Sequence, residues 1–121
     1  MSNNINNVLN QLTSLDGFVG VGLVNAESGM LLGRTGGGNI DLAIAAAVNT
    51  EVVRAKRKAI KRLKLEDDIE DILITLTQQY HLIRLSKLRP KLFFYLVLDR
   101  ERSNLALARM ELEEVEQQLE L

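Results

Sequence analysis

The sequence lacks cysteine and tryptophan, and it has one proline and one histidine among its 121 residues. The absence of cysteine excludes disulfides, thiolate metal sites and cysteine nucleophiles, and it fits a reducing compartment. Aromatic residues make up 4% of the chain, so Leu, Ile, Val and Ala must build the core. No apolar run approaches the roughly 20 residues that span a bilayer, and the polar start MSNNINNVLN differs from a secretory signal. We therefore expect a cytoplasmic protein.

Charge is nearly balanced, with a net charge of −1, so no overall field favours binding to nucleic acid or to an anionic membrane. Hydrophobic residues make up 46% of the chain and charged residues 26%, which is typical of a folded globular protein. This length fits one domain, and we assign residues 1–121 to it.

The chain's glycines lie between Leu15 and Asn39, which raises the question of a phosphate-binding loop. Such a loop needs backbone amides that converge at the start of a helix. GFVGVG has a different spacing from G-x-G-x-x-G and reads as part of a strand, and TGGGN lacks the lysine and hydroxyl of a P-loop. We interpret the stretch as a β-hairpin, FVGVGLV and MLLGR around the turn NAESG, followed by a flexible connector.

Alternation places Gly20 and Gly22 on one strand face with Phe18 and Val24. A strand that is bare on one face predicts close packing by a helix that crosses it.

Apolar spacing predicts three helices and three further strands. The first helix contains Ile5, Val8, Leu9 and Leu12, and the second begins at the cap Asn39 and reaches about Leu63. The strands are DILITL and YHLIRL around Gln78-Gln79, and then LFFYLVLD, which is apolar on both faces and therefore central. The last helix has Ser103 or Asn104 as its cap, and its buried face comprises Leu105, Ala108, Leu112, Val115 and Leu119.

The predicted order is α-β-β-α-β-β-β-α, with strands grouped as hairpins. This order indicates the α+β class: a five-stranded antiparallel sheet between one long helix on one face and two terminal helices on the other.

Three stretches in this order resemble the roadblock/dynein light-chain family: LDGFVGVGLVNAESGMLL, the small-residue helix start IDLAIAAA, and LFFYLVLDRERSNLALARMELEEVEQQL. The last is similar to the bacterial branch, which includes the gliding-motility polarity regulators. The resemblance implies a non-enzymatic homodimer, formed by pairing the second helices and third strands of two copies. It also implies a Ras-like small GTPase as partner, with the protein as a scaffold or an activator of nucleotide hydrolysis. We expect the dimer interface at Ala43, Ala46, Ala47, Ile72, Ile74 and Leu76.

An independent argument from the residues also favours the dimer. The strand DILITL would expose unpaired amides and carbonyls at a sheet edge, and pairing with a symmetric copy satisfies both edges.

The second helix has a basic side, where we place partner binding: Arg54, Arg57, Lys58, Lys61 and Arg62. This side could bind an acidic partner surface or, less favoured, lipid headgroups or nucleic acid; the alternative is a solvated polar face. The helix has no aromatic residue, which argues against base stacking and membrane insertion.

The sequence predicts no catalytic, cofactor or metal site. His81 has no nucleophile or orienting carboxylate beside it in sequence, and we interpret it as an incidental strand residue. The acidic run EDDIED lacks the ligand spacing and central glycine of a calcium loop. The alternatives to a GTPase-binding adaptor are a structural subunit of a larger assembly and, third, a small-molecule sensor. The hypothesis that the protein is an enzyme is the one that the residues support least.

Overall fold

The computed structural model describes residues 3–121 and contains five strands and three α-helices with one short 3₁₀ helix. The elements occur in the predicted order: α1 (Ile5–Asn10), η1 (Gln11–Ser14), β1 (Phe18–Asn25), β2 (Leu31–Gly36), α2 (Leu42–Arg62), β3 (Asp71–Thr75), β4 (Gln79–Leu85), β5 (Leu92–Asp99) and α3 (Leu105–Gln118). The predicted α+β class and element order are confirmed.

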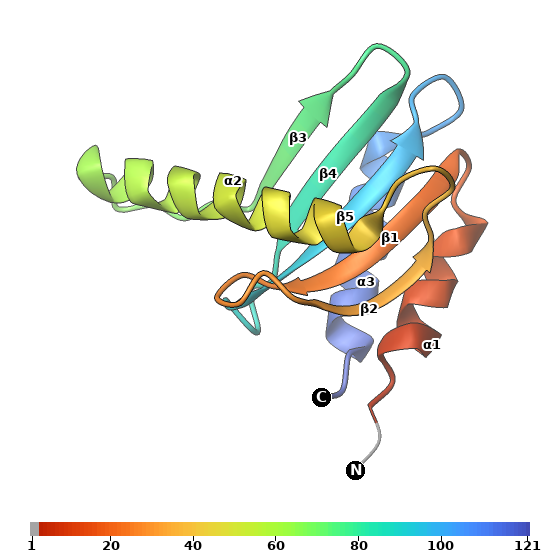
Figure 1. The fold of residues 1–121 in the computed structure, drawn as a ribbon, viewed down its shortest axis with the longest axis horizontal. Helices are drawn as coiled ribbons and strands as arrows, with labels where there is room; N and C mark the ends of the chain where they lie inside the picture. The colour runs from red at the N-terminus through yellow and green to blue at the C-terminus, as the bar shows by residue number, and fades with distance from the viewer. Residues whose placement is uncertain (1–2) are drawn as a thin grey trace.

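The five strands form one antiparallel sheet in the order β2-β1-β5-β4-β3 (Figure 1). β5 is the central strand of this order, as its apolar sequence predicts, and every residue from Leu92 to Leu98 is buried. β2 and β3 are the two edge strands. β3 therefore has hydrogen-bonding groups on one side that pair with no strand of residues 3–121.

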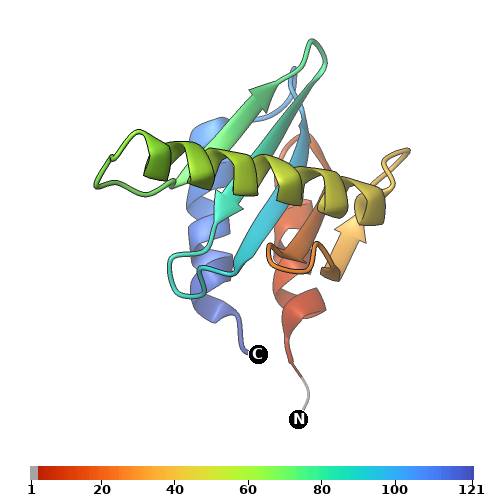
Figure 2. The ribbon, with the colours of Figure 1, turned by 60° about the vertical axis from the view of Figure 1, so that its left-hand side comes forward.

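Helices cover both faces of the sheet (Figures 1 and 2). On one face, α1, η1 and α3 pack against alternate residues of β1 and β5, including Leu23, Phe94 and Leu96. On the other face, α2 packs against the residues in between, such as Phe93 and Tyr95. Because successive side chains of β5 point to opposite faces, this one strand contributes residues to both cores. The predicted buried face of α3 is confirmed, with Leu105 half-buried at its start.

An ion-pair network fastens the start of β3 to the α3 side of the sheet. Arg84 of β4 is buried, and its guanidinium lies 3.2 Å from the carboxylates of both Glu70 and Asp71. Arg109 of α3 reaches the same Asp71 carboxylate at 2.9 Å. This contact raises the pKa of Arg109 above its ordinary value, mainly through the hydrogen bond to Asp71. The predicted acidic connector is therefore not wholly solvated, because its last two residues hold an edge strand in place.

The prediction that Asn39 caps the long helix is wrong. The cap is Asp41, whose side chain accepts hydrogen bonds from the amides of Ala43 and Ile44 at 3.0 and 3.1 Å. A turn closed by the Ile40 amide on the Gly37 carbonyl takes up the preceding residues, so the helix begins later.

The predicted bare face of β1 also needs correction. The pairing of β1 with β5 shifts register between Phe18 and Gly20, and Phe18 packs on the α1 and α3 side while Val24 packs on the α2 side. The two glycines are not covered by a helix. A Cβ on Gly20 would lie 2.5 Å from the Gly37 amide nitrogen, and one on Gly22 would meet the Leu31 side chain.

Within residues 3–121, no helix combines the length and the apolar character that crossing a bilayer requires.

Candidate partner-binding surface

The long helix α2 lies diagonally across the sheet, and its C-terminal part extends beyond β3 (Figures 1 and 2). The buried residues of α2 are Leu42, Ala46, Thr50 and Val53, all in its first twelve positions. Asp41 caps the start, and Lys61 and Arg62 lie in the last turn, where positive charge favours the helix dipole. α2 is thus anchored at one end and largely exposed at the other.

The basic side chains of α2 divide into two groups. Arg54 donates hydrogen bonds to the carbonyls of Ala26 and Glu27, and Arg57 donates one to the Pro90 carbonyl at 2.8 Å. These two arginines hold the β1–β2 and β4–β5 turns against the helix. The others are exposed, and in residues 3–121 no hydrogen bond or ion pair engages their side chains: Lys56, Lys58, Lys61 and Arg62.

Apolar side chains lie on the outward side of α2. Ile44 is 62% exposed and Val48 is 55% exposed, one helical turn apart. Ala43 and Ala47 are also exposed, whereas Ala46 has no exposed surface and packs into the protomer's own core. Of the three alanines predicted at an interface, Ala46 is therefore inaccessible to a partner.

The edge strand β3 contributes the remaining predicted interface residues. Ile72 and Ile74 are half-buried and pack with the core beneath α2, and Leu76 is exposed where the β3–β4 hairpin begins. The part of α2 that extends beyond β3 lies on the same side of the molecule as this edge strand (Figure 1).

His81 belongs to a short chain of side-chain hydrogen bonds that links β4 to β5. Its Nε2 donates to Gln79 Oε1 at 2.9 Å, because the amide oxygen can only accept. Its Nδ1 therefore accepts from the Tyr95 hydroxyl, also at 2.9 Å. Burial lowers the pKa of His81 and raises that of Tyr95. Both ring nitrogens are engaged, so the geometry gives His81 a structural role.

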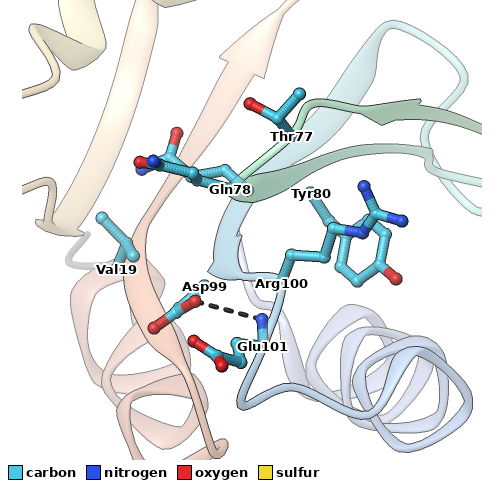
Figure 3. A pocket seen from close by; sticks show the side chains of 8 residues that line it. Val19, Thr77, Gln78, Tyr80, Asp99, Arg100 and Glu101 are labelled. Carbon is cyan, nitrogen blue, oxygen red and sulfur yellow. Dashed lines mark hydrogen bonds between the residues drawn. The ribbon is translucent and has the colours of Figure 1, made fainter.

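A cleft of about 690 Å³ opens at the strand ends that α2 leaves uncovered (Figure 3). The lining residues are Val19, Thr77, Gln78, Gln79, Tyr80, Asp99, Arg100 and Glu101. Sequence reasoning missed this cleft, since its walls come from β1, the β3–β4 hairpin and the end of β5. Pairing of Gln79 with Asp99 across β4 and β5 brings the walls together.

The acidic connector does not assemble into a metal site. The Asp67 and Asp68 carboxylates each accept a hydrogen bond from the next backbone amide. Across residues 3–121, no group of three or more His, Cys, Asp or Glu side chains is placed to hold a metal ion.

Comparisons with known proteins locate this architecture among solved structures. No protein-family model matches the sequence, and no curated protein matches it. Myxococcus xanthus MglB superposes with a TM-score of 0.81 at 21% identity, over 94% of this chain and 89% of MglB. A roadblock/LC7 domain from Streptomyces avermitilis gives 0.81 at 13% identity, over 92% and 90%.

The gliding protein MglB from Thermus thermophilus gives 0.77 at 14% identity, over 91% of this chain and 81% of that protein. At these identities the similarity concerns the fold. The chain has the fold of roadblock/LC7 domains and of the MglB proteins, in agreement with the resemblance seen in its sequence.

Proposed function

We propose that this protein is a single-domain, cytoplasmic, homodimeric adaptor that binds a small Ras-like GTPase and regulates it as a scaffold or an activator of hydrolysis. The observation that carries the proposal is the outward surface of α2, apolar at Ile44 and Val48 and basic at Lys58, Lys61 and Arg62, on a fold shared with MglB. The roadblock resemblance supplies the class of partner.

Dimer formation through α2 and β3 is supported by two features of the protomer. β3 leaves one side unpaired among the described strands, and α2 extends beyond it, with Ala43 and Ala47 exposed nearer the start of the helix. Antiparallel pairing of two β3 strands would join the sheets and bring the α2 helices together. A neighbour of the same fold is described as MglB with tetrameric arrangement, at a TM-score of 0.79 and 14% identity.

The proposal gives the protein no chemistry of its own. An adaptor that accelerates hydrolysis does so by ordering the switch loops of the GTPase, which carries the nucleotide and Mg²⁺. His81 fits this view because its ring nitrogens face Tyr95 and Gln79 within the sheet layer.

The experiment is a pull-down in which the immobilised protein captures partners from native lysate. The lysate is supplemented once with GDP and once with a non-hydrolysable GTP analogue. We expect a Ras-like protein to be recovered preferentially with one nucleotide. The triple variant Lys58→Glu, Lys61→Glu, Arg62→Glu should lose it, because charges across an interface govern the association rate. The control variant Lys87→Glu changes an exposed lysine that the β4–β5 loop contributes.

Two outcomes would contradict the proposal. An identical catch with both nucleotides and without a GTPase would assign the protein to structural subunits of larger assemblies. Recovery of the GTPase by the triple variant at the wild-type level would remove the basic surface from the proposal. A solution mass near 13.6 kDa at micromolar concentration would exclude the homodimer.

A further inference from the structure

We propose that the cleft beside Asp99 and Glu101 receives the basic end of α2 from the second copy of the chain. The inference rests on the proposed homodimer and specifies a contact within it: an acidic pocket in each protomer that is completed by lysines of the other. Charge complementarity between two surfaces of the same chain carries the argument.

The cleft lies at the end of the sheet: Val19, Gln79 and Asp99 are on the face that carries α2, whereas Tyr80 packs with the core on the α1 and α3 face. Val19 packs with the core beneath α2, and Asp99 follows Val97 of that core by two strand positions, so both side chains point to the α2 face. Gln79 is on the same face, because it hydrogen-bonds to His81, which in turn contacts Tyr95. No residue of α2 is among the eight that line the cleft.

The charge of the cleft is acidic. Asp99 and Glu101 lie at its base, and one Asp99 oxygen accepts from the Glu101 amide at 3.1 Å (Figure 3). Arg100 is the single cation among the eight lining residues, and its side chain is turned away. Its guanidinium lies 5.7 Å from the centre of the Tyr80 ring and donates to the Leu76 carbonyl. Both carboxylates therefore lack an internal counter-ion among residues 3–121.

The sheet-facing stripe of α2 changes character where the helix leaves the sheet. This stripe runs through Ala46 and Val53, which are fully buried in the protomer. Helical spacing continues it to Lys56 and Ile60, with Lys64 just past the helix end. Lys56 and Lys64 are exposed, and Ile60 is half-buried. Ile60 lines a hollow with Asp67, Asp68 and Ile69 of the protomer's own connector, so the exposed lysines of the stripe are what it offers to an acidic surface of a second sheet.

Two-fold pairing of β3 brings these surfaces together. In an antiparallel pair, the start of one strand lies beside the end of the other. The start of β3 follows the C-terminal end of α2, and its end leads into Thr77 and Gln78 of the cleft. Because α2 extends beyond β3 in the protomer (Figures 1 and 2), the two-fold axis would place the end of one α2 over the partner's β3–β4 hairpin. Symmetry makes the contact twice in each dimer.

Charge exchange across the interface tests this contact. One variant carries Lys56→Glu and Lys64→Glu, and a second carries Asp99→Asn and Glu101→Lys, where asparagine keeps the acceptor for the Glu101 amide. The control variant is Lys58→Glu with Arg62→Glu. It changes the net charge by the same amount as the first variant, but at exposed positions outside the stripe. Dimer dissociation constants are measured by sedimentation equilibrium at 0.05 and 0.5 M salt, and circular dichroism confirms folding.

We expect each of the first two variants to weaken its homodimer about tenfold at low salt, since exposed ion pairs are individually modest and are made twice. Mixing the two variants should yield a heterodimer with wild-type affinity, because both contacts regain opposite charges. The control should dimerise like the wild type. Dimers of wild-type affinity from both variants, or a mixture without preference for the heterodimer, would overturn this contact and leave the homodimer intact. A monomeric wild type would overturn the homodimer itself.

Discussion

Removal of the Asp71 carboxylate tests how the edge strand β3 is held. Asp71 connects Arg84 of β4 to Arg109 of α3, at 3.2 and 2.9 Å. The Arg84 side chain is only 5% exposed, so Asp71→Ala leaves a buried cation with the carboxylate of Glu70 as its remaining partner. Loss of one partner from a buried pair typically costs about 3–5 kcal/mol.

The expected cost here is smaller, about 2–3 kcal/mol, because the Glu70 side chain stays in reach while 66% exposed and Asp71 itself is 14% exposed. For a chain of this size that loss corresponds to a decrease in melting temperature of about 8–12 °C. Urea denaturation followed by circular dichroism gives the free energy of unfolding directly. The control Glu70→Gln removes an exposed charge and should cost less than about 0.5 kcal/mol.

A double-mutant cycle separates the orphaned charge from lost packing. In an Arg84→Met background no buried cation remains, and Arg109 is exposed enough to regain water, its side chain being 39% exposed. Asp71→Ala should therefore cost less than about 1 kcal/mol in that background. An equal cost in both backgrounds would refute the electrostatic explanation and assign the effect to packing at the start of β3.

Three further changes probe the cap, a glycine and the histidine. Asp41→Ala should lower the free energy of unfolding by about 1 kcal/mol, whereas Asn39→Ala should leave it nearly unchanged in the same urea assay. Gly20→Ala should cost about 1–3 kcal/mol, because the added Cβ would meet the backbone of Gly37; unaltered stability would contradict that close approach. Burial lowers the pKa of His81 below 6.5, so the unfolded chain binds this proton more readily than the folded one. Stability should therefore fall as the pH drops below 6.5, and His81→Gln should flatten that part of a pH series of thermal melts; an unchanged slope would contradict the assignment.

Most of the architecture could be predicted because its signals are local. The apolar run of β5 identified the central strand, and the spacing of Ala108, Leu112 and Val115 identified the buried face of α3. Asn104 was one of two predicted caps, and its side chain accepts from the Leu107 amide. Each feature depends on residues within a few positions of one another.

The features that could not be predicted depend on pairing between distant segments. The Phe18 side chain lies on the α1 and α3 face because the pairing of β1 with β5 shifts register, which alternation along β1 alone does not reveal. The cap moved from Asn39 to Asp41 because a turn at Gly37 uses the intervening residues. The division of the α2 arginines follows likewise from loops that lie about 30 residues away along the chain.

On these proposals, α2 presents three surfaces with different contacts. Arg54 and Arg57 bind the protomer's own turns, and changes there would disturb the fold together with any partner contact. Lys56 lies on the stripe that continues beyond the sheet, whereas Lys58 lies outside that stripe. A reversal of charge at Lys58 should therefore act on GTPase recovery and spare dimer affinity, and a reversal at Lys56 should do the opposite. If both reversals changed both measurements equally, the surfaces would be one interface, and the separation of dimer contact from partner contact would be wrong.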